Sequence, residues 1–185
     1  LIGTNKDEGT LFHAPIYAKA VADETEYRAA LAVRFPGKVD AIVAQYPVAS
    51  YPSANDALAA VTGDAFFVCP ARRTARIAEG AGNATFVYSF EHALEHPFVS
   101  VFGVVHSSEI PFVFGNDNYP LGSIGTDTAL VDQIQTFWTS FAIDDVVQDW
   151  PPWTDEFRTY EQFGDAGATG GQDYKGAVCD FWDAL

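Results

Sequence analysis

Apolar residues follow a helical period most clearly in the last third of the chain. From Thr126 onward they recur at intervals of three and four residues, which places them on one face of a helix. These residues are Leu130, Ile134, Phe137, Trp138 and Phe141. The same reasoning predicts helices over residues 24–34, 38–45 and 64–79, an alanine-rich helical turn over 54–61, and a short terminal helix from Asp173.

Capping and breaking residues mark the ends of these helices. Asp23 and Ser53 precede two of them and are expected N-caps, because their side-chain oxygens can accept hydrogen bonds from free backbone N–H groups. Pro36 and Pro47 end the first two helices, and Gly80 closes the helix over 64–79.

Two segments are predicted to be strands. Residues 85–90 alternate and are rich in β-branched and aromatic types. Residues 1–4 resemble the end of a buried strand that leads into a loop, and the glycine-rich stretch 164–171 is predicted to be a loop. Long helices separated by only a few strands indicate an α/β fold.

The composition indicates a folded, acidic domain. The chain has 185 residues, enough for one domain with a core, and 48% of them are hydrophobic, which argues against disorder. Acidic side chains outnumber basic ones by 25 to 10, giving a net charge of −15. This charge disfavours nucleic acid as a partner, because phosphate binding needs clustered Lys and Arg. The apolar runs are too short and interrupted to predict a membrane span.

The first residues predict that further sequence precedes this chain. The chain contains no methionine, and it opens inside an expected strand, where backbone groups need neighbours on both sides. Two explanations stay open: the sequence is a trimmed part of a longer chain, or proteolysis has split that longer chain.

Two motifs carry the candidate chemistry. Residues 3–9 read G-T-N-K-D-E-G, and residues 103–115 read G-V-V-H-S-S-E-I-P-F-V-F-G. A histidine works as a general base when its other ring nitrogen is held by a third group, usually a carboxylate. Glu8 and His106 are the candidates for that carboxylate and that base.

Both motifs resemble those of the type B carboxylesterase and cholinesterase family of α/β-hydrolases. There the acid lies in a G-x-N-x-D-E-G stretch and the histidine further on, in a G-x-x-H-x-x-E-[IL]-x-[FY]-[VF]-F-G stretch. This order agrees with the Ser…Glu…His order of the fold. The resemblance implies the C-terminal part of an α/β-hydrolase fold, with a central sheet flanked by helices. Residues 1–185 would be the C-terminal portion of one catalytic domain, and the N-terminal portion that bears the nucleophile would lie outside this chain.

The resemblance assigns roles to three side chains. Glu8 would be the acid, in preference to Asp7, with Gly9 allowing a sharp turn after it. His106 would accept the proton of a serine hydroxyl and return it to the leaving group. Glu109 would stiffen the loop that carries His106. The plain alternatives are an acidic surface turn, a buried structural histidine and a surface glutamate.

Leu11 and Phe12 would line the substrate gorge near the acyl group by the same resemblance. Cholinesterases carry an aromatic residue at the first of these positions, where it holds a quaternary ammonium group by cation–π attraction. The leucine in this chain puts choline esters in doubt and favours a neutral ester. Core packing is the alternative for both residues.

The two cysteines, Cys69 and Cys179, lie in contexts that resemble half-cystines joined in secreted cholinesterases. A bridge that closes a loop of about 100 residues contributes about 4–5 kcal/mol in the chain-entropy model. It would imply an oxidising compartment, and so a secreted or periplasmic protein. Two unpaired buried thiols are the alternative.

Two further motifs are weaker. Residues 92–96 fit the H-x-x-E-H zinc-protease pattern, but that chemistry needs a helix, and Pro97 directly after the motif leaves no room for one. Asn83 opens an N-glycosylation sequon, a triplet that is common by chance.

The nucleophile itself is missing from the sequence. No G-x-S-x-G elbow occurs, residues 122–125 have the wrong spacing, and no H-G-G oxyanion loop is present. The resemblance implies a carboxylic ester hydrolase that acts through an acyl-enzyme, and we predict that it uses no metal or cofactor. The substrate would be a small-molecule ester. This chain would supply the acid and the histidine that act on it, and an N-terminal segment of the same enzyme would supply the serine and the oxyanion hole. The chain alone would be inactive. The alternative is a non-catalytic, cholinesterase-like binding or adhesion module.

Overall fold

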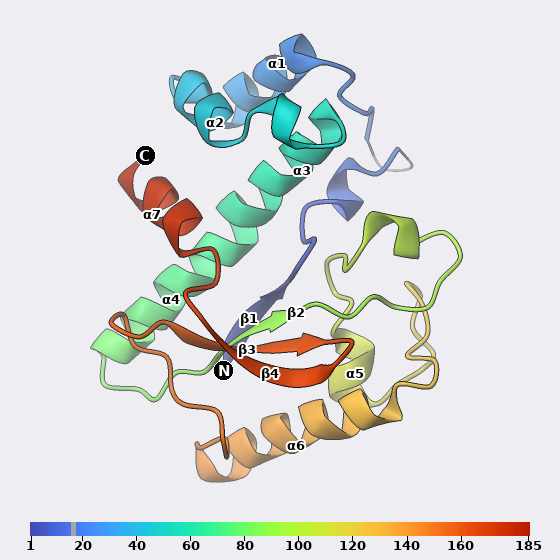
Figure 1. The fold of residues 1–185 in the computed structure, drawn as a ribbon, viewed down its shortest axis with the longest axis vertical. Coiled ribbons are helices and arrows are strands. Elements are labelled where there is room, and N and C mark those ends of the chain that lie inside the picture. Colours follow the sequence, from blue (N-terminus) through green and yellow to red (C-terminus); the bar gives the residue numbers. More distant parts are fainter. Residues whose placement is uncertain (16–17) are drawn as a thin grey trace.

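The computed structural model describes residues 1–15 and 18–185, and they form an α/β architecture (Figure 1). In this part of the chain four strands form one sheet in the order β1-β2-β3-β4. The strands are β1 (Ile2–Asn5), β2 (Val87–Phe90), β3 (Thr159–Gly164) and β4 (Gly167–Gln172). The first three are parallel, and β4 is antiparallel to β3. Segments that are far apart in sequence therefore meet at the carboxyl ends of β1 and β2.

The predicted strands at residues 1–4 and 85–90 are confirmed as β1 and β2. The prediction of a loop over 164–171 is wrong, because most of this stretch forms β4 in a hairpin with β3. Glycine is a poor strand former because it has no side chain to pack. Here Gly171 is paired with Tyr160, and a Cβ on Gly171 would lie only 2.4 Å from the Tyr160 ring. The ring thus covers the strand where the glycine has no side chain.

Most helices begin and end close to the predicted positions, but the short helix over 110–114 was not predicted. They are α1 (Glu24–Arg34), α2 (Val39–Gln45), α3 (Ala54–Gly63), α4 (Cys69–Gly80), α5 (Ile110–Phe114), α6 (Thr128–Asp144) and α7 (Gly176–Ala184). Short 3₁₀ helices are η1 (Leu11–His13), η2 (Val48–Ser50) and η4 (Ser100–Phe102). Both predicted N-caps are confirmed: Asp23 accepts a hydrogen bond from the Glu26 N–H, and Ser53 accepts one from the Asp56 N–H.

One long continuous rod replaces the two separate helical segments predicted over 54–61 and 64–79. Helix α3 passes through the π-helical turn η3 (Asp64–Val68) into α4 without interruption, and Figure 1 shows the rod crossing the molecule diagonally. The alanine-rich segment at 54–61 is therefore a full part of this rod. A π-helical turn inserts an extra residue and rotates the helix face that follows, a device often found near functional sites.

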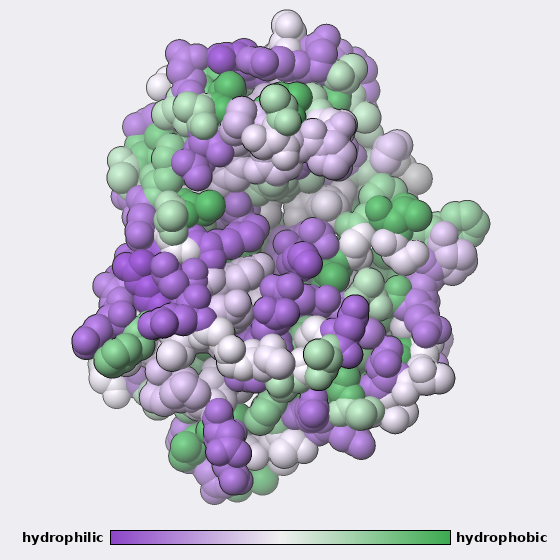
Figure 2. All heavy atoms as spheres, viewed as in Figure 1, coloured by the Kyte–Doolittle hydropathy of each residue, from purple (hydrophilic) through white to green (hydrophobic). Residues whose placement is uncertain are grey.

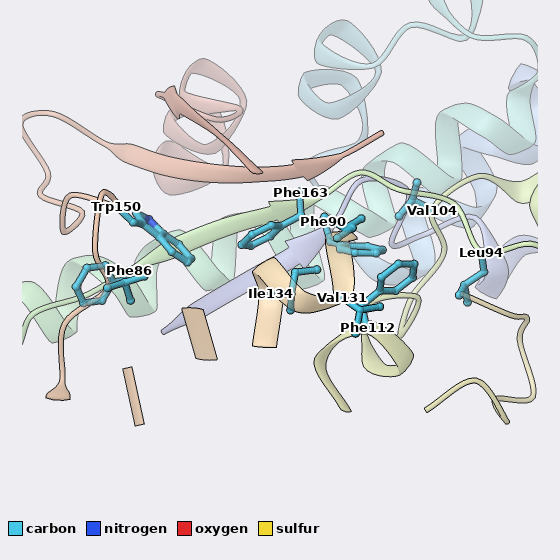
Figure 3. Close-up of a cluster of buried hydrophobic side chains, with 11 residues drawn as sticks. Phe86, Phe90, Leu94, Val104, Phe112, Val131, Ile134, Trp150 and Phe163 are labelled. Atoms are coloured by element: carbon cyan, nitrogen blue, oxygen red, sulfur yellow. The ribbon is translucent and has the colours of Figure 1, made fainter. Parts of the chain in front are cut away.

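Helix α6 packs against the sheet and closes the main hydrophobic core (Figure 3). Its residue Ile134 is buried, and the Phe137 and Trp138 rings contact the Phe163 ring of β3, as the predicted apolar face requires. A second core lies between α1, α2 and α3. It consists mainly of Tyr27, Leu31, Ile42, Leu58 and Val61.

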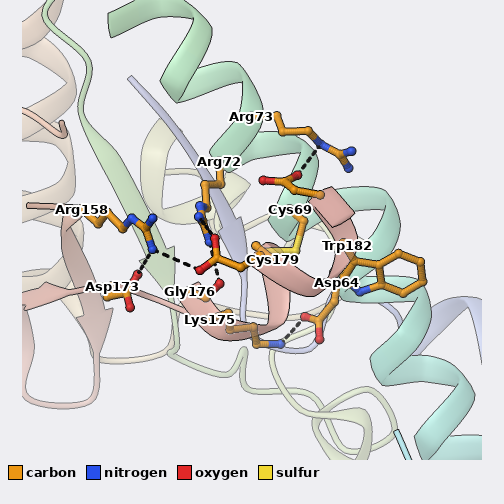
Figure 4. Close-up of a disulfide and its surroundings, with 12 residues drawn as sticks. Asp64, Cys69, Arg72, Arg73, Arg158, Asp173, Lys175, Gly176, Cys179 and Trp182 are labelled. Carbon is orange, nitrogen blue, oxygen red and sulfur yellow. Dashed lines mark hydrogen bonds and ion pairs between the residues drawn. A yellow bond between two sulfur atoms is a disulfide. The ribbon is translucent and has the colours of Figure 1, made fainter. Parts of the chain in front are cut away.

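The disulfide Cys69–Cys179 joins the start of α4 to α7, which confirms the predicted pairing (Figure 4). A hydrogen bond and an ion pair reinforce the joint: the Arg72 guanidinium donates to the Gly176 carbonyl at 2.7 Å and also pairs with Asp180. At the beginning of η3, the buried carboxylate of Asp64 lies 2.5 Å from Lys175 Nζ.

The surface is mixed in polarity. Figure 2 shows hydrophilic side chains over most of one face, with a hydrophobic cluster over η4. Phe98 and Val101 in that region are 76% and 75% exposed. No helix within the described residues has both the length and the apolar character needed to cross a bilayer.

Candidate active site

Glu8 and His106 lie in direct hydrogen-bond contact, although they are 98 positions apart in sequence. Glu8 follows the carboxyl end of β1, and His106 lies in the loop that leads to α5. The Glu8 carboxylate is 5% exposed; its Oε1 accepts a hydrogen bond from the Asn5 N–H at 2.8 Å, and its Oε2 lies 2.6 Å from His106 Nδ1. The two motifs identified in the sequence therefore form one constellation.

This contact determines which ring nitrogen of His106 is free. A carboxylate only accepts hydrogen bonds, so Nδ1 carries the proton that it donates to Glu8. Nε2 then keeps its lone pair and can accept a proton. The His106 side chain is 42% exposed, so part of the ring is accessible to a reacting group.

Burial raises the pKa of the Glu8 carboxyl group above its ordinary value. The Asn5 N–H and the His106 ring act in the opposite direction, and the negative charge of Glu109 adds to the rise in pKa. A carboxylate of raised pKa is a better hydrogen-bond acceptor. It therefore holds the Nδ1 proton of His106 firmly.

Asp7 hydrogen-bonds the backbone of the loop that carries His106, at Val104. Its Oδ2 accepts from the Val104 N–H at 2.9 Å, and its own N–H donates to the Val104 carbonyl at 3.0 Å. Gly103 next to this clamp has φ +80°, and a Cβ there would lie 2.2 Å from the Asp7 carboxylate. The neighbouring carboxylates of the acid motif thus make different contacts.

Gly9 allows the loop that carries Glu8 (the acid loop) to contact the rod formed by α3, η3 and α4. A Cβ on Gly9 would lie 1.9 Å from the Ala59 carbonyl oxygen, a distance that no side chain tolerates. Gly63 faces the same contact from the rod. The loop that carries Glu8 is therefore seated directly on the α3 backbone.

Two aromatic rings flank the imidazole. The ring centroids of Phe12 and Phe67 lie 5.5 Å and 4.9 Å from that of His106, and the two phenyl rings stack on each other at 5.6 Å. Phe67 lies on η3, and the sequence analysis missed it, because helical spacing does not show which of Phe66 and Phe67 turns toward the loop. Leu11 is partly buried at the start of η1, and its predicted place in a substrate gorge stays a prediction.

The model of the carboxylesterase family matches residues 1–182. The chain belongs to the carboxylesterase family. A cholinesterase of Mus musculus is 35% identical to it over 166 residues, which cover 77% of this chain and 26% of the mouse protein. The chain thus spans about a quarter of the length of this relative. The family and the architecture together confirm the predicted fold class, part of an α/β-hydrolase.

Glu109 contacts the acid side of this candidate site through Asn5. Its Oε2 accepts a hydrogen bond from Asn5 Nδ2 at 2.6 Å. The residue lies just before α5 and follows His106 in the loop, whereas Asp7 contacts the loop before it, at Val104. Its predicted supporting role stays a prediction.

The weaker motifs lie apart from the pair. The segment with His92 and His96 forms no helix, as predicted. The two ring nitrogens of His92 lie 2.8 and 2.9 Å from the carboxylates of Asp165 and Asp127. No group of three or more His, Cys, Asp or Glu in residues 1–15 and 18–185 is arranged to hold a metal ion. Asn83 is exposed in the loop between α4 and β2.

Proposed function

We propose that this chain supplies the acid and the base of a serine carboxylesterase, with Glu8 orienting His106. The observation that carries the proposal is the 2.6 Å contact between Glu8 Oε2 and His106 Nδ1. Membership in the carboxylesterase family supports the reaction class, hydrolysis of a carboxylic ester. The serine and the oxyanion donors come from a segment that precedes these residues in the enzyme.

In the first half of the reaction His106 Nε2 accepts the proton of the serine hydroxyl as the serine oxygen bonds to the ester carbonyl carbon. The imidazolium is stabilised by the buried carboxylate of Glu8. It then gives the proton to the leaving alcohol oxygen as the ester C–O bond breaks, which produces the acyl-enzyme and a free alcohol.

In the second half water replaces the alcohol. Nε2 accepts a proton from the water as its oxygen bonds to the acyl carbon, and the same proton returns to the serine oxygen when the acid product leaves. His106 ends each cycle neutral. The enzyme therefore needs no metal or cofactor to balance the reaction.

The surroundings of the imidazole favour a neutral ester. Phe12 and Phe67 present apolar rings beside His106, and Phe12 is 44% exposed. Leu11 stands where an ammonium-binding aromatic residue would be expected, so a choline ester gains no cation–π contact there. The disulfide and the similarity to a cholinesterase support an oxidising location, secreted or periplasmic.

A reconstitution experiment tests the proposal. The isolated 185-residue chain should not turn over a p-nitrophenyl ester, whereas the same chain together with the serine-bearing segment should. A fluorophosphonate probe should label that segment, and a His106→Gln chain should abolish both signals. Steady turnover by the chain alone would contradict the proposal. Absence of labelling in the complete protein would favour the alternative, a cholinesterase-like binding or adhesion module.

A further inference from the structure

Asn5 lies where the sheet, the acid loop and the histidine loop meet. It is the last residue of β1, is paired with Phe90 of β2, and is 1% exposed. Its backbone N–H donates to Glu8 Oε1 at 2.8 Å. Because this oxygen is already engaged, the carboxylate presents Oε2 to His106.

The side-chain amide of Asn5 binds the histidine loop at two points. Nδ2 lies 3.0 Å from the Val105 carbonyl oxygen and 2.6 Å from Glu109 Oε2. Both partners are acceptors, so the NH₂ end of the amide must face them, with one hydrogen for each. The two contacts lie on either side of His106 in the sequence. The Ser108 N–H donates to the same Val105 carbonyl at 3.1 Å and closes the turn between them.

Among the described residues, no other residue forms hydrogen bonds both to Glu8 and to the segment that follows His106. The His106 ring is 42% exposed and is flanked by aromatic rings that can slide, whereas hydrogen bonds fix direction. Asp7 holds the loop at Val104, before the histidine. Asn5 is the buried residue whose hydrogen bonds reach both the acid and the segment that follows the histidine.

We propose that Asn5 is a positioning residue for the Glu8–His106 pair. Its backbone N–H orients the carboxylate, and its amide fixes the loop that carries the imidazole. It touches no reacting atom. The catalytic meaning of this inference rests on the proposed function, but the geometric part can be measured without turnover.

The first test replaces Asn5 by a residue of similar size that cannot donate. In the complete enzyme, Asn5→Leu should lower kcat about 10–100-fold with little change in KM, because a misplacement of about 1 Å can cost about 100-fold in rate. The second readout is the ¹H NMR resonance of the His106 Nδ1 proton. It should be resolved far downfield in the unsubstituted protein, and should broaden or vanish in the variant.

A reversed pair tests the contact with Glu109. Asn5→Asp alone places a carboxylate against two acceptors and should impair both readouts. In the double variant that also carries Glu109→Gln, the glutamine NH₂ group can donate to the new carboxylate, so the hydrogen bond is restored in the opposite direction. Part of each readout should then recover. Asn55→Leu is the matched control. That residue bonds His13 O and Val21 N at 3.0 and 3.1 Å, so its loss should affect stability without moving the resonance.

The outcomes separate this inference from the proposed function. An Asn5→Leu protein that folds and keeps both kcat and the resonance overturns the role of Asn5, even if Glu8→Gln abolishes activity. Loss of the resonance in a protein without esterase activity supports the positioning role and removes only the catalytic conclusion. Should Asn5→Leu not fold, the reversed pair decides, and absence of any recovery overturns the inference.

Discussion

At the scale of single residues, one proton decides what His106 can do. Glu8 is buried and accepts from Nδ1, so Nε2 is the nitrogen left for chemistry. The carboxylate is also held by the Asn5 N–H, which limits its rotation. A change that keeps the shape of Glu8 but alters its hydrogen-bonding character therefore tests the arrangement most directly.

We expect Glu8→Gln to lower kcat/KM by about 1,000–10,000-fold in the complete enzyme. With the amide oxygen accepting from the Asn5 N–H, the NH₂ group of the glutamine faces His106 Nδ1. It then stabilises the tautomer that carries its proton on Nε2, which cannot accept from a serine. Ester hydrolysis rates measure the loss. Glu156→Gln, on an exposed residue, is the control and should leave the rate unchanged. Equal rates for the two variants would rule out the orienting role of Glu8.

A second residue-scale prediction concerns acid stability. His13 is 5% exposed, and its Nε2 lies 2.8 Å from Thr62 Oγ1. The Thr62 hydroxyl donates to the Leu58 carbonyl at 2.9 Å, so its oxygen accepts from His13 and the ring is neutral with its proton on Nε2. Burial lowers the pKa of His13, and the charge of Arg34 lowers it further.

The sign of the pH dependence follows from this lowered pKa. In the unfolded chain His13 titrates near pH 6.5, so its contribution to stability is complete above about pH 6.5 and is lost as the pH falls through the folded pKa. Each unit of lowering is equivalent to about 1.4 kcal/mol. Urea unfolding at neutral and mildly acidic pH should show a larger loss for the unsubstituted protein than for His13→Gln. Identical pH profiles would contradict the prediction.

At the scale of elements, the contact between the acid loop and the rod positions the site. The loop approaches the α3 backbone at Gly9, and Gly63 on the rod faces it. The next turn of the rod, η3, carries Phe67 against the imidazole. The same rod therefore positions the loop of the acid and one aromatic wall of the site.

Gly9→Ala should reduce the free energy of unfolding by about 3 kcal/mol, because its Cβ would lie 1.9 Å from a backbone oxygen that cannot move aside easily. Gly80→Ala is a matched control at the end of α4, where a Cβ meets nothing within 4 Å. It should stay within about 0.5 kcal/mol of the unsubstituted protein. Urea unfolding of both variants checks the difference. Similar urea midpoints for the two variants would contradict the prediction, because they would show that the acid loop can shift to accommodate the added Cβ.

At the scale of the whole molecule, charge opposes compactness. The net charge of −15 produces self-repulsion in the folded state. Four of the ten basic side chains form ion pairs with aspartates, and these pairs join α4, α7 and the segment before β3. The four are at positions 72, 73, 76 and 158. Salt weakens the attraction within these pairs, but it also weakens the repulsion among acidic side chains. In the described part of the chain, the acidic side chains without a basic partner outnumber these pairs, so the loss of repulsion is the larger effect.

Raising the ionic strength from about 0.01 M to about 0.15 M should therefore raise Tm, since the Debye length falls from about 30 Å to about 8 Å. Each kcal/mol of repulsion relieved corresponds to about 2–4 °C in a domain of this size. Scanning calorimetry in sodium chloride measures the shift. Close to the pI of about 4.3 the effect should disappear, and a Tm that falls with salt at neutral pH would contradict the argument.

Much of this architecture is visible in the sequence because its signals are local. Caps at Asp23 and Ser53, prolines after the first helices and the apolar face of α6 depend on neighbours within a few residues. The motifs around Glu8 and His106 also stand out by their spacing. The glycine-rich strand β4 was missed because its pairing depends on cover from Tyr160, which lies on another strand.

The sequence by itself determined the helices, the family and the residue types of the acid and the base. The resemblance already favoured Glu8 over Asp7 as the acid, whereas tertiary structure alone decided that Phe67 and not Phe66 contacts the imidazole and that Asn5 joins the two loops. Local propensity acts over a few residues, whereas these contacts span from 39 to 104 positions and depend on how the π-helical turn and the strand ends are packed. Their geometry follows from the packing of distant segments, which no short pattern contains.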